Sequence, residues 1–194
     1  MTTIASISLS LDGFYTAANP SEQHPLGIGG ETLHGWFAHD VADRGQLTAD
    51  EVLAPEFERT GALVMGWDSY EHAQALWGPH PPFEMPIFVL SRTARDDDVR
   101  EGSTFHFLDS FDTAIERAKA VAGAQAVGLH GGGAIRQGLC TGVLEELQLH
   151  LVPTILGQGR ALFAGVMDAP VTLELIRAAE GPGVTHLKYR VQRK

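Results

Sequence analysis

Short, almost continuous apolar runs recur along the chain, and several of them end in glycine or serine. Such runs are typical of strands that are buried on both faces of a parallel sheet. A first strand is predicted to begin near Ile4 and to end at Asp12-Gly13. Further buried strands are predicted at residues 61–66, 86–90, 104–108 and 126–130.

Segments with helical spacing separate these runs. Asp68 and Ser110 each precede such a segment and are expected to cap it through their side-chain oxygens. Residues 16–30 carry no periodicity, and loops of this length inside compact domains are usually binding loops or covers. Helices are predicted at residues 32–39, 50–60, 68–74, 111–122 and directly after Gly133.

The last quarter of the chain has a different pattern. Residues 144–153 alternate between leucine and polar positions, which predicts a half-exposed strand. Residues 171–179 and 184–191 flank Gly181-Pro182-Gly183 and predict a β-hairpin. The whole pattern indicates a three-layer α/β fold with a mixed sheet and a C-terminal antiparallel hairpin.

Composition and charge narrow the classes of function. The chain has 194 residues, of which 44% are hydrophobic, so we expect one domain spanning residues 1–194. A net charge of −10 disfavours binding to nucleic acid or to an anionic membrane. The single cysteine and the lack of a long apolar run favour a cytoplasmic protein. The nine histidines are scattered, so no metal site is expected.

The glycine triplet Gly131, Gly132 and Gly133 lies between a predicted strand and a predicted helix. Glycines let a backbone approach a ligand closely, and a helix N-terminus attracts anions. Two more strands, which end at Gly66 and Ser91, have similar turns. Because ligands bind at the carboxyl ends of strands in such sheets, the three turns are expected to share one phosphate-containing ligand.

The order of these motifs resembles the dihydrofolate reductase-like superfamily, and in particular the reductase domain of bifunctional riboflavin-biosynthesis deaminase-reductases and their stand-alone bacterial relatives. The similarity extends over nearly the whole chain. The matching segments are residues 8–14 (SLSLDGF), 63–66 (LVMG), 89–93 (VLSRT), 131–133 (GGG), 142–153 (GVLEELQLHLVP) and 156–163 (LGQGRALF).

This resemblance implies an NADPH-dependent reductase that transfers hydride to a small heterocyclic, carbonyl or imine substrate. It also implies a homodimer. The cofactor-binding residues that it implies border the pyrophosphate, the adenosine and the nicotinamide. They are Ala5, Gly13, Thr16, Gly66, Trp67, Ser69, Ser91, Arg92, Thr93, Gly131, Gly132, Gly133, Ala134 and Ile135.

Two features leave alternatives open. Relatives commonly have arginine after the Met-Gly pair, whereas this chain has Trp67-Asp68, so NADH is an alternative cofactor and a non-catalytic nucleotide- or pterin-binding module is an alternative function. The proton donor is expected to be a carboxyl group, because folate reductases use one on the helix before the Val-Met-Gly strand. Asp50 occupies about this position, and Asp12 is the second candidate.

Overall fold

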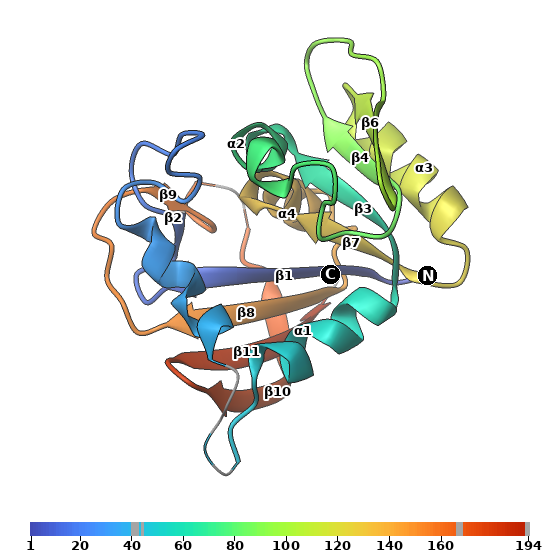
Figure 1. The fold of residues 1–194 in the computed structure, drawn as a ribbon. Coiled ribbons are helices and arrows are strands. Elements are labelled where there is room, and N and C mark those ends of the chain that lie inside the picture. The colour runs from blue at the N-terminus through green and yellow to red at the C-terminus, as the bar shows by residue number, and fades with distance from the viewer. Residues whose placement is uncertain (40–42, 44, 166–168, 193–194) are drawn as a thin grey trace.

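A mixed sheet organises the molecule (Figure 1). The computed structural model describes residues 1–39, 43, 45–165 and 169–192. Within them, the sheet has the strand order β10-β11-β8-β1-β7-β3-β4-β6-β5. Its strands are β1 (Thr3–Ser10), β3 (Thr60–Gly66), β4 (Ile87–Leu90), β5 (Asp98–Arg100), β6 (Ser103–Leu108), β7 (Ala126–His130), β8 (Glu146–Val152), β10 (Thr172–Gly181) and β11 (Val184–Gln192).

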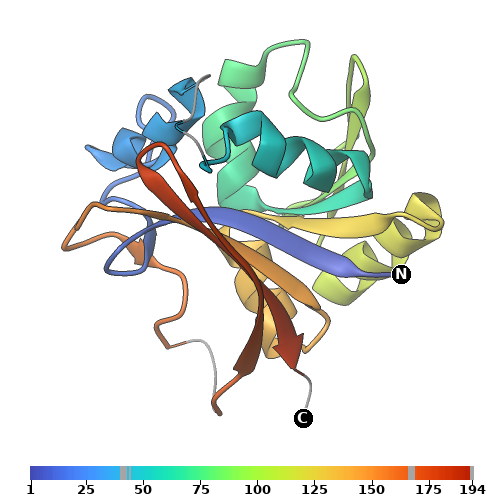
Figure 2. The same ribbon diagram turned by 90° about the horizontal axis from the view of Figure 1, so that it is seen from below.

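Helices cover both faces of this sheet, as Figure 2 shows. One face carries the 3-10 helix η1 (Gly30–Ala38) together with α1 (Ala49–Glu58) and α2 (Trp67–Trp77). The other face carries α3 (Phe111–Ala122) and α4 (Gly132–Cys140). The predicted three-layer α/β fold with a mixed sheet is thus confirmed, and so is the C-terminal antiparallel hairpin, formed by β10 and β11.

The strand directions place β1 in the middle of a parallel block. β1 pairs in parallel with both β8 and β7, and the parallel order continues through β3, β4 and β6. Strands β11, β10 and β5 are antiparallel to their neighbours. The carboxyl ends of β1, β7, β3 and β4 therefore lie at one edge, where a ligand site is expected in such sheets.

Local sequence signals account for two of the helices. In α3 the side chain of Ser110 accepts a hydrogen bond from Thr113 N at 3.3 Å, as predicted, and the apolar positions are buried against the sheet. In α1, Thr48 and Glu51 form a capping box, which satisfies amide groups at the start of the helix.

Two local predictions were wrong. Asp68 does not cap α2, because the N-cap of this helix is Gly66, two residues earlier, and the Asp68 carboxylate pairs with Arg160 instead. β8 is not half-exposed. Gln148 and His150 are both 2% exposed, because η1 packs over this face of the sheet and sets Trp36 against His150.

A short strand ends at Thr16, the first residue of the segment predicted as an aperiodic loop. β2 (Phe14–Thr16) pairs with β9 (Arg160–Ala161) in a separate antiparallel sheet. β9 has only two residues, so it is too short to be recognised from a periodic sequence pattern. This pairing holds the start of the loop and the region around Arg160 next to each other.

Candidate functional site

A cavity of about 630 Å³ lies between the sheet and the layer formed by η1, α1 and α2. Its walls are mostly apolar, as is usual for sites that bind small organic molecules. The polar and titratable side chains that line it come from nine elements: β1, β2, η1, α1, β3, α2, β7, β8 and β9. They are Ser6, Ser8, Tyr15, Thr16, Glu31, His34, Glu56, Thr60, Asp68, Ser69, His72, His130, His150 and Arg160.

The glycine turn forms one end of this cavity. Gly131 has a φ of 82°, and a Cβ there would collide with the Ser69 hydroxyl. A Cβ on Gly132 would lie 2.3 Å from the ring of Tyr15. A Cβ on Gly66 would be 3.6 Å from Ala134 N, so the turn after β3 and the start of α4 adjoin each other. The predicted convergence of these two turns is therefore present in the fold.

Two arginines bring positive charge to this end of the cavity. Arg160 lines it and pairs with Asp68, while Arg136 on α4 donates to the carbonyl oxygen of Ala161 at 3.3 Å. Burial raises the pKa of Tyr15, and the charges of Arg160 and Arg136 act in the opposite direction. Trp67, which follows Met65-Gly66, carries no positive charge, but Arg160 on β9 and Arg136 on α4 supply two positive charges nearby.

The turn after β4 lies outside this cavity. Ser91 is buried, and its hydroxyl donates to the carbonyl oxygen of Thr93 at 2.7 Å, which fixes the turn. Arg92 is exposed. The guanidinium carbon of Arg95 lies 4.4 Å from the centre of a Trp67 ring, in a cation–π contact.

The other predicted cofactor residues divide into two groups. Ala5 and Thr16 line the cavity beside Ser69 and Gly131, and the buried Thr16 hydroxyl has no hydrogen-bond partner among the described residues. The remaining predicted residues do not line the cavity. They are Gly13, Gly66, Trp67, Ser91, Arg92, Thr93, Gly132, Gly133, Ala134 and Ile135.

The two predicted proton donors do not line the cavity. Asp50 is exposed in the first turn of α1. Asp12 is also exposed, and it accepts hydrogen bonds from Ser10 Oγ at 2.6 Å, Leu156 N at 3.1 Å and Gly157 N at 2.7 Å. The Ser10 bond is the main cause that lowers the pKa of Asp12. The ionised Asp12 carboxylate therefore holds the loop after β8 through these hydrogen bonds.

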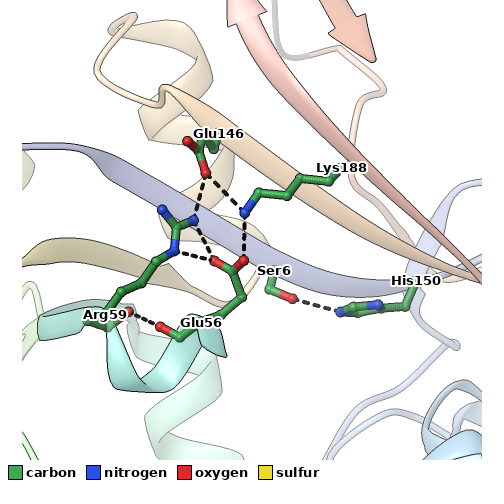
Figure 3. Close-up of polar contacts among 7 residues, drawn as sticks. Ser6, Glu56, Arg59, Glu146, His150 and Lys188 are labelled. Atoms are coloured by element: carbon green, nitrogen blue, oxygen red, sulfur yellow. Dashed lines mark hydrogen bonds and ion pairs between the residues drawn. The ribbon is translucent and has the colours of Figure 1, made fainter. Parts of the chain in front are cut away.

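The carboxylate that reaches the cavity from α1 is Glu56, which sequence reasoning missed. Its oxygens accept hydrogen bonds from Arg59 Nε at 2.8 Å and from Lys188 Nζ at 2.6 Å. Both cations also contact Glu146, so four charges form one network under the cavity (Figure 3). The helical spacing of α1, with Leu53, Glu56 and Phe57 on one face, was the available signal.

Buried histidines are the second group that sequence reasoning missed. His150 lines the cavity, and its Nε2 lies 2.7 Å from Ser6 Oγ (Figure 3). Its Nδ1 lies 2.8 Å from Nδ1 of His186. Burial lowers the pKa of His150 to about 3, and it lowers the pKa of His130 to about 4. These side chains are therefore neutral at physiological pH.

The described part of the chain holds neither a candidate metal site nor a candidate membrane-spanning helix. No cluster of three or more histidine, cysteine, aspartate or glutamate side chains there could hold a metal ion. No helix there is long and apolar enough to cross a membrane.

Comparison with solved structures shows the same fold in several proteins. A putative riboflavin biosynthesis protein from Shewanella sp. PV-4 is 21% identical, with a TM-score of 0.70 and 100% of each chain covered. A pyrimidine reductase-like protein from Corynebacterium diphtheriae is 14% identical, with a TM-score of 0.63 over 100% of this chain and 92% of that one.

A longer protein contains this fold as about half of its length. The diaminohydroxyphosphoribosylaminopyrimidine deaminase/5-amino-6-(5-phosphoribosylamino)uracil reductase of Thermotoga maritima is 11% identical, with a TM-score of 0.61 over 98% of this chain and 56% of that one. No curated protein matches the chain significantly in sequence. The family described as RibD C-terminal domain matches residues 2–187. This protein therefore belongs to the RibD C-terminal domain family, a family of reductases of the riboflavin-biosynthesis type.

Proposed function

We propose that this protein is an NADPH-dependent reductase of a small heterocyclic substrate. The observation that carries the proposal is the glycine turn at the end of the cavity, with the Arg160 guanidinium beside it. Gly131 and Gly132 leave no room for a Cβ, so these two positions require the bare backbone that a pyrophosphate site uses. The residues present thus fit a dinucleotide.

In this proposal the cofactor lies along the carboxyl ends of β4, β3, β7 and β1. The Gly131 turn, Gly66 and Arg160 bind its pyrophosphate. Ser91, Arg92 and the Trp67–Arg95 pair border the adenosine, where guanidinium groups bind a 2′-phosphate. Ala5 and Thr16 border the nicotinamide. The bound cofactor supplies a hydride, and the apolar walls exclude water from the place of transfer.

The substrate side of the cavity favours a flat, partly polar ring. Phe57, Phe83 and Trp77 offer aromatic surface, and Glu56 places a carboxylate among them. Such a combination suits a pyrimidine- or pterin-like ring that carries amino groups, because a carboxylate accepts their hydrogen bonds. A solved relative is named as a 5-amino-6-(5-phosphoribosylamino)uracil reductase, and we propose a related pyrimidine as the substrate.

One observation favours a binding module without turnover as the second candidate. Asp68 pairs with Arg160 at the glycine turn and so offsets the charge that a pyrophosphate would meet. The same ion pair is also compatible with an active enzyme that uses NADH in place of NADPH. The expected homodimer and the expected cytoplasmic location stay predictions.

Titration with NADPH and with NADH tests the proposal. Tryptophan fluorescence should change saturably, and the Trp67→Phe variant should lose most of that change, while a Trp36→Phe variant controls for the other rings. Calorimetry gives both affinities directly. NADPH oxidation with 5-amino-6-(5-phosphoribosylamino)uracil then separates an enzyme from a binding module. An absence of saturable binding of either cofactor by both methods refutes the assignment.

A further inference from the structure

Three side chains form a continuous hydrogen-bonded chain that starts in the cavity. Ser6 on β1 and His150 on β8 both line it, and they are joined at 2.7 Å. His150 is joined at 2.8 Å to His186 on β11, which is 1% exposed. The chain thus runs across three neighbouring strands, from the cavity into the interior (Figure 3 shows its first link).

The link between the two imidazoles constrains where their protons lie. Nδ1 faces Nδ1, so a hydrogen bond between them holds one proton, and the two tautomers are coupled. If His150 donates at Nδ1, its Nε2 accepts the Ser6 proton. If His186 donates, His150 carries its own proton on Nε2 and donates it to Ser6. The Ser6 hydroxyl is then free to donate into the cavity.

We propose that Ser6 delivers the proton that accompanies hydride transfer to the substrate, and that His150 and His186 replace this proton. This inference rests on the proposed reductase function. Ser6 is then a catalytic residue, since its hydroxyl touches the substrate. His150 and His186 are positioning residues that act through it.

The proton movements balance. The Oγ–H bond of Ser6 breaks as its proton passes to the substrate atom that gains the electron pair of the reduced double bond. The Nε2 proton of His150 passes to Ser6, and the Nδ1 proton of His186 passes to His150. A proton from solvent binds Nε2 of His186 in the same step, so this ring never becomes an anion. Every side chain ends neutral, with both imidazoles in the opposite tautomer, and the substrate has gained one hydride and one proton. After product release, water in the cavity gives Ser6 a proton as its own returns to Nε2 of His150, the Nδ1 proton of His150 returns to His186, and Nε2 of His186 releases its proton, which restores the starting tautomers.

The surroundings hold this chain in one geometry. The ring of Trp36 lies 4.7 Å from the ring of His150 and 5.1 Å from that of His186, between centres, and its Nε1 donates to Ser8 at 3.1 Å. Nε2 of His186 is buried and has no hydrogen-bond partner among the described residues. This nitrogen lies against Gly181, beside the turn of the β10–β11 hairpin, so proton uptake there requires a local opening of that turn.

The carboxyl groups near the cavity are engaged otherwise. Both oxygens of Glu56 accept hydrogen bonds from cations, Asp68 pairs with Arg160, and Glu31 pairs with His24. Asp12 accepts three hydrogen bonds outside the cavity. Neutral imidazoles and a hydroxyl can both give and receive a proton without placing a charge in this apolar space. Ser6 therefore replaces the expected carboxyl donor.

Kinetics with 5-amino-6-(5-phosphoribosylamino)uracil and NADPH test the relay in the full-length protein. Ser6→Ala should lower kcat about a hundredfold or more, as for loss of a general acid, with the NADPH affinity unchanged by calorimetry. The solvent deuterium isotope effect on kcat should change with it. Ser110→Ala removes a hydroxyl at the N-cap of α3, on the opposite face of the sheet, and should keep the wild-type kcat and isotope effect. A Ser6→Ala kcat within threefold of wild type overturns the relay.

A second pair of variants separates proton transfer from packing. His186→Phe keeps a ring but cannot bond to His150, and it should lower kcat and abolish the isotope effect. His186→Asn can again bond to Nδ1 of His150 and should restore part of kcat. Equal loss in both variants, with unfolding temperatures as in wild type, contradicts the relay.

NMR of the imidazole nitrogens tests the relay without any substrate. In wild type, one proton should be shared between the two Nδ1 atoms, and Ser6→Ala should shift the tautomer balance of His150. Two unlinked rings with protons on both Nε2 atoms overturn the relay even if the reductase is active. Failure to bind NADPH or NADH refutes the proposed function instead, and the NMR result still decides the proton chain.

Discussion

Arg160 and Asp68 form an ion pair between β9 and the first turn of α2, although 92 positions separate them in the sequence. The pair lies beside the glycine turn, so it sets the charge that an anionic ligand meets there. Asp68 neutralises the guanidinium until a ligand competes for it.

Substitutions of Arg160 and of Asp68 should have opposite effects on cofactor binding. Arg160→Ala should weaken NADPH binding about tenfold or more, because a charge-assisted contact to the pyrophosphate is lost. Asp68→Asn should strengthen it, because the guanidinium is released. Calorimetry at two salt concentrations checks both, and the effects should shrink at high salt. Equal affinities in wild type and both variants would place the pyrophosphate elsewhere.

The glycine turn predicts that two neighbouring Gly→Ala substitutions change the stability of the protein in opposite directions. Gly132→Ala should lower stability by about 1–3 kcal/mol, because its Cβ meets the Tyr15 ring. Gly133→Ala is the matched control, since nothing lies within 4 Å of its Cβ, and helix propensity should raise stability by up to about 1 kcal/mol. Denaturant unfolding measures both. Unchanged stability of Gly132→Ala contradicts the close packing of Tyr15.

The four-charge network predicts a cooperative loss of stability. Lys188→Met should cost about 2 kcal/mol, because it leaves Glu56 and Glu146 close together with one cation fewer. Adding Glu56→Gln should recover part of that loss, because the like charges are then separated. A double-mutant cycle by denaturant unfolding gives the coupling energy, and strictly additive effects would show that the network does not act as a unit.

The buried histidines predict a loss of stability in acid. Burial is the largest cause of the lowered pKa of His150, and His186, His34 and Arg177 act in the same direction. A folded-state pKa of about 3 lies below the unfolded value, so stability is complete above about pH 6.5 and falls as the pH drops toward 3. The slope should be about 1.4 kcal/mol per pH unit for each such histidine.

Unfolding free energies between pH 7 and pH 4 check this slope. His150→Phe should flatten it, whereas His80→Gln, which changes an exposed side chain, should leave it as in wild type. A slope that persists in His150→Phe would assign the acid sensitivity to other groups, with His130 as the next to test.

The sequence predicted those structural features that depend on residues close to one another along the chain. The Ser110 cap, the apolar face of α3 and the strand before the glycine turn depend on local spacing, and they are confirmed. The buried strands and the turns at their ends followed from apolar runs that end in glycine or serine. The prediction that Asp68 would cap α2 was wrong because a distant arginine competes for its carboxylate.

What the sequence could not show depends on contacts between distant segments. Periodicity indicated that Gln148 and His150 share one face of a strand, but it could not indicate that η1 covers that face. The link between Ser6 and His150 spans 144 positions, and the ion pair between Arg59 and Glu146 spans 87. Only the order of strands in the sheet brings these residues together.

The central place of β1 has a consequence for how the molecule folds. This strand comes first in the chain, yet its partners β7 and β8 begin at residues 126 and 146. Pairings over such long separations fold slowly, because loop entropy is lost before contacts compensate for it. Until both partners have formed, β1 has unpaired edges that other chains could join. Folding should therefore be slow, with its aggregation-sensitive stage lasting until the middle of the sheet closes.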